Sequence, residues 1–239
     1  TAGFTGAELE NLLNEAAIMA AKDRRRFVRQ ADIKSAFIKV GIGAEKRSKV
    51  ISDKEKRITA YHETGHAILF HMLPDMEAVY TISIIPTGPG AAGYTMPQPE
   101  NDDMFQTRGK MMQYITVCLG GRVAEELIFG SVTSGASNDI EQATKLARAM
   151  ITRLGMSDNF GMMALETVGN QYLGGDASLA CSEQTAAKID EEVRQVIAQC
   201  YDKAKQILSE NMPKLHELAE YLLERETITG EEFMNILQG

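Results

Sequence analysis

The chain has 239 residues, with 25 Lys or Arg against 33 Asp or Glu, so its formal net charge is −8. This acidic balance argues against nucleic-acid binding, and no apolar run reaches membrane-spanning length. No secretory signal opens the sequence, and its three cysteines are odd in number and lack a C-x-x-C pair. We therefore expect a soluble protein with reduced thiols in a cytosolic compartment. Abundant Ala, Leu, Met, Glu and Lys favour helices.

Two short helices are predicted in the first 43 residues. Thr5 and Glu8 have the spacing of a capping box, and the apolar residues of one helical face follow them: Leu9, Leu12, Leu13, Ala16, Ala17 and Ala20. The basic run 24–26 is interpreted as a solvated loop before a second helix at about 31–39. So few residues cannot hold a core of their own. They are therefore expected to be an appendage or the tail of another domain, joined through a charged linker at 44–52.

The remaining elements follow from periodicity and capping signals. A helix is expected over 53–73, because Ser52 and Glu55 form a capping box and Pro74 ends the run. Strands are expected at 78–85 and about 92–96, the second at an edge because prolines follow it. Asn138 is expected to cap a helix that runs to Leu154. Further helices are predicted at about 103–118, 122–129, 183–209, 213–223 and after Thr229, with irregular structure at 156–181.

The first long helix contains the segment His62-Glu63-Thr64-Gly65-His66, which reads H-E-x-x-H. Two histidines four residues apart lie on one face of a helix and can reach the same ion. The glutamate between them can take a proton from a bound water, as in zinc metalloproteases. The alternative is a helix that carries two surface histidines. A glycine in mid-helix costs about 1 kcal/mol relative to alanine, so Gly65 suggests tight packing against the motif.

A catalytic zinc needs a third protein ligand and an open position. His71 has turned about 180° from His62 on the same helix, and His216 lies far away along the chain. Acidic residues and Cys118 remain. Asp139 follows a loop rich in Ser and Gly, although it could equally be a carboxylate that caps a helix.

Glu125 and Glu126 follow a double glycine. Either could be the ligand, or could hold the second ring N–H of a ligand histidine. Adjacent helical residues point about 100° apart, so at most one of the two should face the metal. The spacing alone leaves the choice open among these glutamates, Asp139 and Cys118.

The short strand at 92–96 offers a candidate substrate site. An edge strand beside a metal ion can pair with an extended peptide, which makes Gly93, Tyr94 and Thr95 candidate binding residues. An ordinary hairpin explains the same pattern equally well.

Several motifs together resemble the FtsH family of ATP-dependent, membrane-anchored zinc proteases. In chain order they are His-Glu-Thr-Gly-His-Ala at 62–67, Ile-Ile-Pro at 84–86, Gly-Tyr-Thr at 93–95, Leu-Gly-Gly-Arg-Val-Ala-Glu-Glu at 119–126, Thr-Ser-Gly-Ala-Ser-Asn-Asp-Ile at 133–140 and Ala-Thr at 143–144. The resemblance implies that Asp139 is the third zinc ligand beside His62 and His66, and that Glu63 is the general base.

The opening Gly-Phe-Thr-Gly-Ala-Glu-Leu at 3–9 resembles the last helical part of an AAA ATPase module. The sequence has no G-x-x-x-x-G-K-[ST] motif, so ATP and Mg²⁺ are expected only in the full-length protein. The resemblance implies a mainly α fold with three parts. Residues 1–43 are expected to be a C-terminal helical fragment of an AAA lid, residues 44–52 a linker, and residues 53–239 a helical zinc peptidase domain with a small β-ribbon or sheet.

The expected function is zinc-dependent endoproteolysis of unfolded or misfolded polypeptides, with one Zn²⁺ per chain. The resemblance implies a homo-hexamer fed by an ATP-driven unfoldase ring. It also implies anchoring at the cytoplasmic face of a bacterial-type inner membrane, through segments that this chain lacks. Two rival interpretations are an assembly module with an inactive site and a non-protease zinc hydrolase that uses Cys118 as a ligand.

Overall fold

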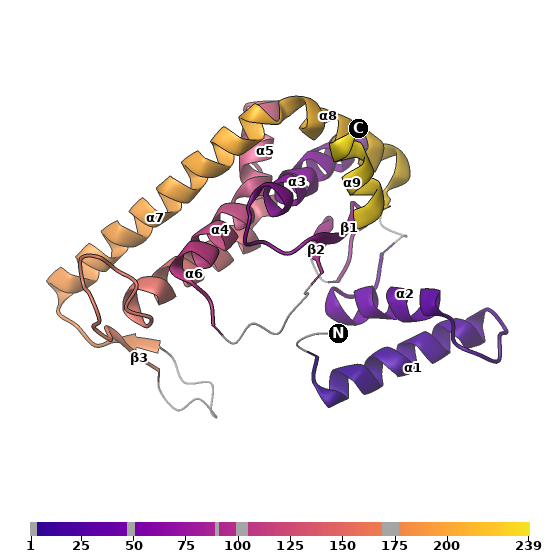
Figure 1. The fold of residues 1–239 in the computed structure, drawn as a ribbon, viewed down its shortest axis with the longest axis horizontal. Helices are drawn as coiled ribbons and strands as arrows, with labels where there is room; N and C mark the ends of the chain where they lie inside the picture. The colour runs from indigo at the N-terminus through magenta and orange to yellow at the C-terminus, as the bar shows by residue number, and fades with distance from the viewer. Residues whose placement is uncertain (1–3, 47–50, 89–90, 99–104, 169–176) are drawn as a thin grey trace. The chain divides into compact units, whose positions relative to one another are not determined.

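The structure is a computed structural model that describes residues 4–46, 51–88, 91–98, 105–168 and 177–239. Helices dominate these residues and two small antiparallel sheets accompany them (Figure 1), which confirms the predicted mainly α class. The chain divides into two compact units. The first comprises Thr1–Glu63, Glu77–Met104 and His216–Gly239, and the second comprises Thr64–Met76 and Phe105–Leu215.

The first unit opens with a helical hairpin, α1 (Gly6–Lys22) and α2 (Gln30–Gly41). The predicted capping box at Thr5 is confirmed. Leu12 and Ala16 of α1 pack with Ala36 of α2. The predicted apolar face of α1 is only partly buried, because Leu9 and Leu13 are exposed in this two-helix arrangement.

The loop between α1 and α2 is more ordered than its basic composition indicates. The Arg25 guanidinium donates to both carboxylate oxygens of Asp32, at 2.7 and 2.6 Å. The interpretation of all three arginines as solvated is therefore wrong for Arg25, whose planar fork matches a carboxylate. Arg24 and Arg26 are exposed.

The first unit also contains a three-stranded antiparallel sheet in the order β2-β1-β5. Its strands are β1 (Val79–Ser83), β2 (Tyr94–Pro97) and β5 (Thr227–Thr229). Ile82 in the centre faces Thr95 on one side and Ile228 on the other. The predicted edge position of β2 is confirmed by this order. Strand β5 was not expected, because three residues beside a capping box are too few to show a strand period.

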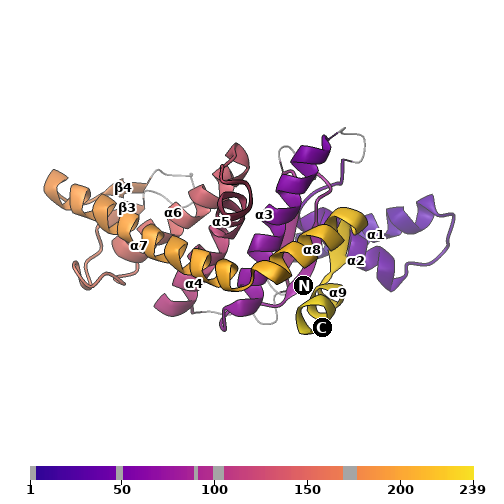
Figure 2. The same cartoon turned by 90° about the horizontal axis from the view of Figure 1, so that it is seen from above.

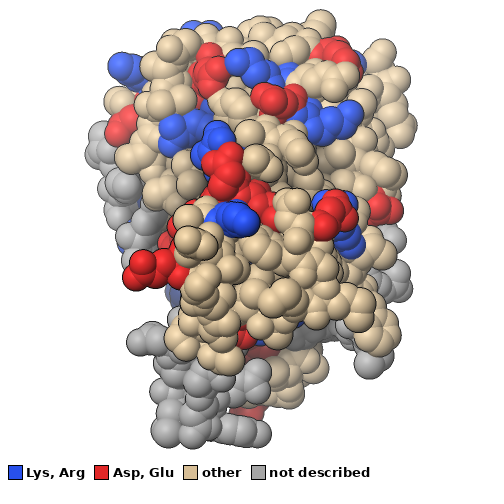
Figure 3. Space-filling model, turned by 90° about the vertical axis from the view of Figure 1, so that its left-hand side faces the viewer, with Lys and Arg blue, Asp and Glu red and all other residues tan. Residues whose placement is uncertain are grey.

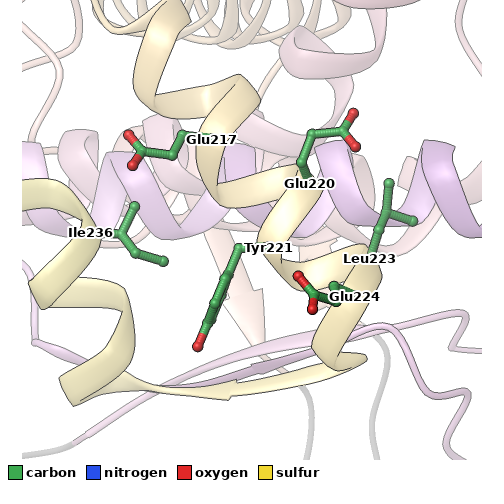
Figure 4. Close-up of a pocket in the computed structure, with 6 residues that line it drawn as sticks. All are labelled: Glu217, Glu220, Tyr221, Leu223, Glu224 and Ile236. Carbon is green, nitrogen blue, oxygen red and sulfur yellow. The ribbon is translucent and has the colours of Figure 1, made fainter.

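Helices α8 (Met212–Arg225) and α9 (Gly230–Gln238) flank β5 in the sequence. The capping box of Thr229 and Glu232 at the start of α9 is confirmed. Tyr221 donates to Glu232 at 3.4 Å, which ties α8 to the first turn of α9. A pocket on the same helices has three glutamates among its lining residues (Figure 4), which are Glu217, Glu220, Tyr221, Leu223, Glu224 and Ile236.

The second unit is a helical bundle. The long α7 (Glu183–Glu210) packs along α4 (Arg108–Cys118), α5 (Gly120–Phe129) and α6 (Ser137–Thr152), as Figures 1 and 2 show. One hydrophobic cluster of this unit contains apolar residues of α4, α6 and α7, among them Met111, Ile115, Ala143, Ala147, Met150, Ile151, Ile189 and Val193. On α5, the Glu126 carboxylate accepts hydrogen bonds from Tyr201 and Lys205 of α7. This pairing lowers the pKa of Glu126, with the Lys205 hydrogen bond as the larger cause.

Two predictions in this unit are wrong. Helix α6 begins at Ser137 and not after an Asn138 cap, because Thr133 caps a preceding 3-10 turn, η1 (Ser134–Ala136), which runs directly into α6. The region expected to be irregular contains a small antiparallel pair, β3 (Glu166–Val168) and β4 (Ala177–Leu179).

Acidic and basic side chains are interspersed on the face shown in Figure 3. Within the described ranges, no helix is both long enough and apolar enough to cross a bilayer.

Candidate metal centre

The H-E-x-x-H segment lies on α3 (Asp53–Met72). The predicted capping box starts this helix, because Ser52 Oγ and the Glu55 amide and carboxylate bond reciprocally. Every residue from 59 to 70 is buried. Both His62 and His66 are only 8% exposed. The motif is therefore in the protein interior, and the alternative of two surface histidines is wrong.

A backbone carbonyl sets the orientation of His66. Its Nδ1 lies 2.7 Å from the carbonyl oxygen of Val117, at the end of α4. A carbonyl can only accept, so Nδ1 carries the proton and the lone pair of the neutral ring lies on Nε2. That Nε2 lies 3.9 Å from Oδ2 of Asp139. The imidazole therefore presents its metal-binding nitrogen to the aspartate, a common arrangement for histidine ligands.

His62, His66 and Asp139 form one group whose ligand atoms all lie within 4.8 Å of one another. Two imidazoles and a carboxylate are a donor set that suits zinc and leaves a position for water. The Val117 carbonyl already holds the tautomer that a metal needs, so the residues fit the ion. The group lies beside Glu63, which is 6% exposed. The arrangement has the residue types of a hydrolytic metal centre: three candidate ligands, with a carboxylate next to one of them in the chain.

Two side chains of α5 anchor the loop that precedes Asp139. The Glu125 carboxylate accepts a hydrogen bond from the Thr133 amide at 2.7 Å, and Arg122 donates to the Thr133 carbonyl at 2.8 Å. Glu125 is only 1% exposed. Thr133 then caps η1, which continues into α6 and places Asp139 in the first turn of that helix. Glu125 thus helps to position Asp139 indirectly, by holding the loop at Thr133.

The other candidate ligands lie outside the group of three. Glu126 faces Tyr201 and Lys205 on α7. Burial, and then the negative charge of Asp139, raise the pKa of the Cys118 thiol to about 12.

The candidate substrate strand contacts the motif glutamate directly. Thr95 on β2 donates to the Glu63 carboxylate at 2.9 Å. Gly93 packs so closely that a Cβ there would lie 2.7 Å from Cγ2 of Thr59. Tyr94 is buried. The side chain of Thr95 therefore points toward α3, and the backbone of β2 is what the sheet edge offers to a peptide.

Sequence reasoning missed the Val117 carbonyl and the anchoring of Thr133. The contact with the Val117 carbonyl leaves no signal in the sequence, because every residue type supplies a backbone carbonyl. The second had a partial signal, since Arg122, Glu125 and Thr133 belong to motifs that carry the family resemblance. Their pairing depends on the packing of α5 against the loop, which residue spacing does not reveal.

A family profile described as "Peptidase family M41" matches residues 49–236, and one described as "AAA+ lid domain" matches residues 1–35. The chain belongs to peptidase family M41. Similar proteins named "ATP-dependent zinc metalloprotease FtsH" occur in Caldicellulosiruptor bescii (50% identity over 99% of this chain and 39% of the relative) and Clostridium perfringens (49%, 100% and 33%). A third, in Thermotoga maritima, is 46% identical over 99% of this chain and 39% of its own length. The predicted resemblance to FtsH is confirmed, and the chain spans between one third and two fifths of these relatives.

Proposed function

We propose that this protein is a zinc-dependent endopeptidase that hydrolyses peptide bonds in unfolded polypeptides. The proposal is supported by the group of His62, His66 and Asp139, whose candidate ligand atoms lie within 4.8 Å of one another, and by Glu63 next to His62 in the chain. When bound, the zinc ion would lower the pKa of a water molecule and polarise the scissile carbonyl.

The residues of the chain have separate roles in this reaction. His62, His66 and Asp139 would hold the ion. Glu63 would accept a proton from the attacking water and pass it to the leaving amine, as a general base and then a general acid. The buried surroundings of α3 exclude bulk water, which strengthens electrostatic interactions at the reacting atoms.

The substrate is expected to bind in an extended form. Strand β2 is at the sheet edge and Gly93 directly precedes it, so the main chain at Gly93, Tyr94 and Thr95 can hydrogen-bond to a peptide as an added strand. Backbone pairing recognises any extended chain and gives side chains only a loose preference. This recognition suits a protease that receives unfolded polypeptide.

The relatives support a wider assignment for the complete protein. We propose the boundaries 1–43 for an AAA lid segment, 44–52 for a linker and 53–239 for the peptidase domain. The same proposal includes a homo-hexamer, in which an ATP- and Mg²⁺-dependent ring delivers unfolded polypeptide to the peptidase domain. It also includes a membrane anchor outside this sequence. The family membership and the relatives' names support it.

Replacing Glu63 tests the chemistry. Glu63→Gln keeps the size of the side chain but removes the base, so we expect the turnover of an unfolded casein substrate to fall about 10²- to 10⁴-fold. Zinc content should stay at the wild-type level, because Glu63 is not a ligand. Glu191→Gln is the matched control, since that carboxylate is on α7 and pairs with Arg194. Wild-type turnover by Glu63→Gln, or a zinc-loaded wild type that never cuts casein, would overturn the proposal.

A further inference from the structure

The Thr95 hydroxyl contacts two parts of the same residue. Its Oγ1 lies 2.9 Å from the backbone carbonyl oxygen of Glu63 and 2.9 Å from Oε2 of the same glutamate. Both acceptors lack hydrogens when the carboxylate is ionised, so the threonine is the donor. The single proton of this hydroxyl is shared between the two oxygens as a bifurcated hydrogen bond, which keeps the Glu63 carboxylate close to a fixed point on α3.

This contact depends on the close approach of β2 to α3. A Cβ at Gly93 would lie 2.6 Å from the Ser83 carbonyl oxygen, 2.7 Å from Cγ2 of Thr59 and 3.0 Å from Cγ of Glu63. A real Cβ does not fit at these distances, so only glycine lets the strand lie this close. Gly93 thus allows the hydroxyl two residues later to reach Glu63.

The strand pairing is consistent with a Thr95 side chain on the face of β2 that is directed toward Glu63 on α3. Thr95 is opposite Ile82 of β1, and Ile82 is fully buried. Because side chains alternate along a strand, the neighbouring Tyr94 points to the opposite face. The threonine side chain is therefore directed to the base, while recognition of a peptide at this edge would use main-chain atoms.

We propose that Thr95 is a positioning residue for the general base, which it holds in the orientation needed for proton transfer. The inference rests on the proposed peptidase function and deepens it. A carboxylate on a flexible side chain samples several rotamers, and proton transfer needs one within hydrogen-bond reach of the water. Fixing that rotamer raises kcat. It leaves KM nearly unchanged, because the hydroxyl faces away from the peptide.

The test compares three variants in the complete natural protein, assayed with zinc, ATP and a short fluorogenic peptide. Thr95→Val keeps the shape and removes the hydroxyl, so we expect kcat to fall about 10- to 100-fold with unchanged zinc content. Thr95→Ser restores the donor and should return kcat to within about threefold of wild type, with KM within about twofold for both variants. Thr81→Val is the matched control, since Thr81 on β1 loses a similar bond, which its hydroxyl donates to the Ile228 carbonyl at 3.0 Å.

A double-mutant cycle separates positioning from packing. The Glu63→Asp carboxylate is one methylene shorter and is withdrawn from the hydroxyl. Thr95→Val should therefore change kcat much less in that background than in the wild type. Three outcomes would overturn the role of Thr95 and leave the peptidase assignment intact. Thr95→Val could lower kcat equally in both backgrounds, it could lower kcat/KM only by raising KM, or Thr81→Val could lower kcat as much as Thr95→Val does. A zinc-loaded wild type without activity would overturn both.

Discussion

The Val117 carbonyl decides which nitrogen of His66 can bind a metal ion. It occupies Nδ1 at 2.7 Å and leaves Nε2 toward Asp139. Glu125 orients Asp139 indirectly, because its carboxylate accepts a hydrogen bond from the Thr133 amide in the loop before Asp139. Groups on α4 and α5 thus orient two of the three candidate ligands, His66 directly and Asp139 through its loop. Fixing ligands in advance reduces the cost of organising them around an ion.

A single ion pair in the helical hairpin gives a pH-dependent prediction. Hydrogen bonds from Arg25, and then from the Arg29 amide, lower the pKa of Asp32 to about 2 from an ordinary value of 3.8. A carboxyl whose pKa is lower in the folded state stabilises that state above its unfolded pKa. This stabilisation is lost as the pH falls through the folded pKa.

We therefore expect Asp32→Asn to lower the melting temperature most above about pH 5, with the difference from wild type shrinking between about pH 4 and pH 2. Far-ultraviolet circular dichroism during heating measures it. A difference that stays constant down to pH 2 would show that the Asp32 charge has no part in the stability of the hairpin.

At the level of whole elements, two glycines allow α3 to lie directly against the junction of α4 and α5. A Cβ at Gly65 would lie 2.6 Å from the Gly120 carbonyl oxygen and 2.8 Å from Cβ of Ala124. A Cβ at Gly120 would lie 3.0 Å from the Gly65 carbonyl oxygen. The neighbouring atoms are mostly backbone and cannot move aside. This close contact accounts for a glycine inside the motif helix, which the sequence analysis interpreted as a sign of tight packing.

Gly65→Ala tests this contact. Alanine gains about 1 kcal/mol in helix propensity, but the overlap with backbone atoms should cost more, so we expect net destabilisation of about 1–3 kcal/mol. Chemical denaturation gives the free energy of unfolding. Gly109→Ala on α4 is the control, because its nearest neighbour would be Thr107 Oγ1 at 3.8 Å. A Gly65→Ala protein as stable as wild type would mean that α3 and α5 separate easily.

Elements with strong local signals were predictable from the sequence. The capping boxes at Thr5, Ser52 and Thr229 place three helix starts correctly. Strands β3, β4 and β5 are three residues each, too short to show a period. Strand β5 forms only through β1, which is distant in the chain, while β3 and β4 pair with each other. The start of α6 was missed because Thr133 caps a 3-10 turn and not the helix itself.

For the molecule as a whole, the metal centre joins segments distant in sequence. His62 and His66 lie one turn apart on α3, so their pairing follows from helix geometry and was predictable. Asp139 lies 73 positions beyond His66, and spacing left it as one of several candidates until the family resemblance selected it. In the fold, its carboxylate lies within 4.8 Å of the ligand nitrogens of the two histidines. The proposed metal site therefore depends on Asp139 as its third ligand.

The most direct test is the zinc content of purified wild type and Asp139→Asn, measured by elemental analysis with Asp190→Asn on α7 as the control. Asp190 pairs with Arg148 at 2.6 Å and carries the same charge. We predict about one zinc ion per chain for wild type and the control, and loss of most of the zinc from Asp139→Asn, because two imidazoles alone leave the site short of a ligand. An Asp139→Asn protein that keeps a full complement of zinc would contradict the account and make Glu125 the next ligand to test.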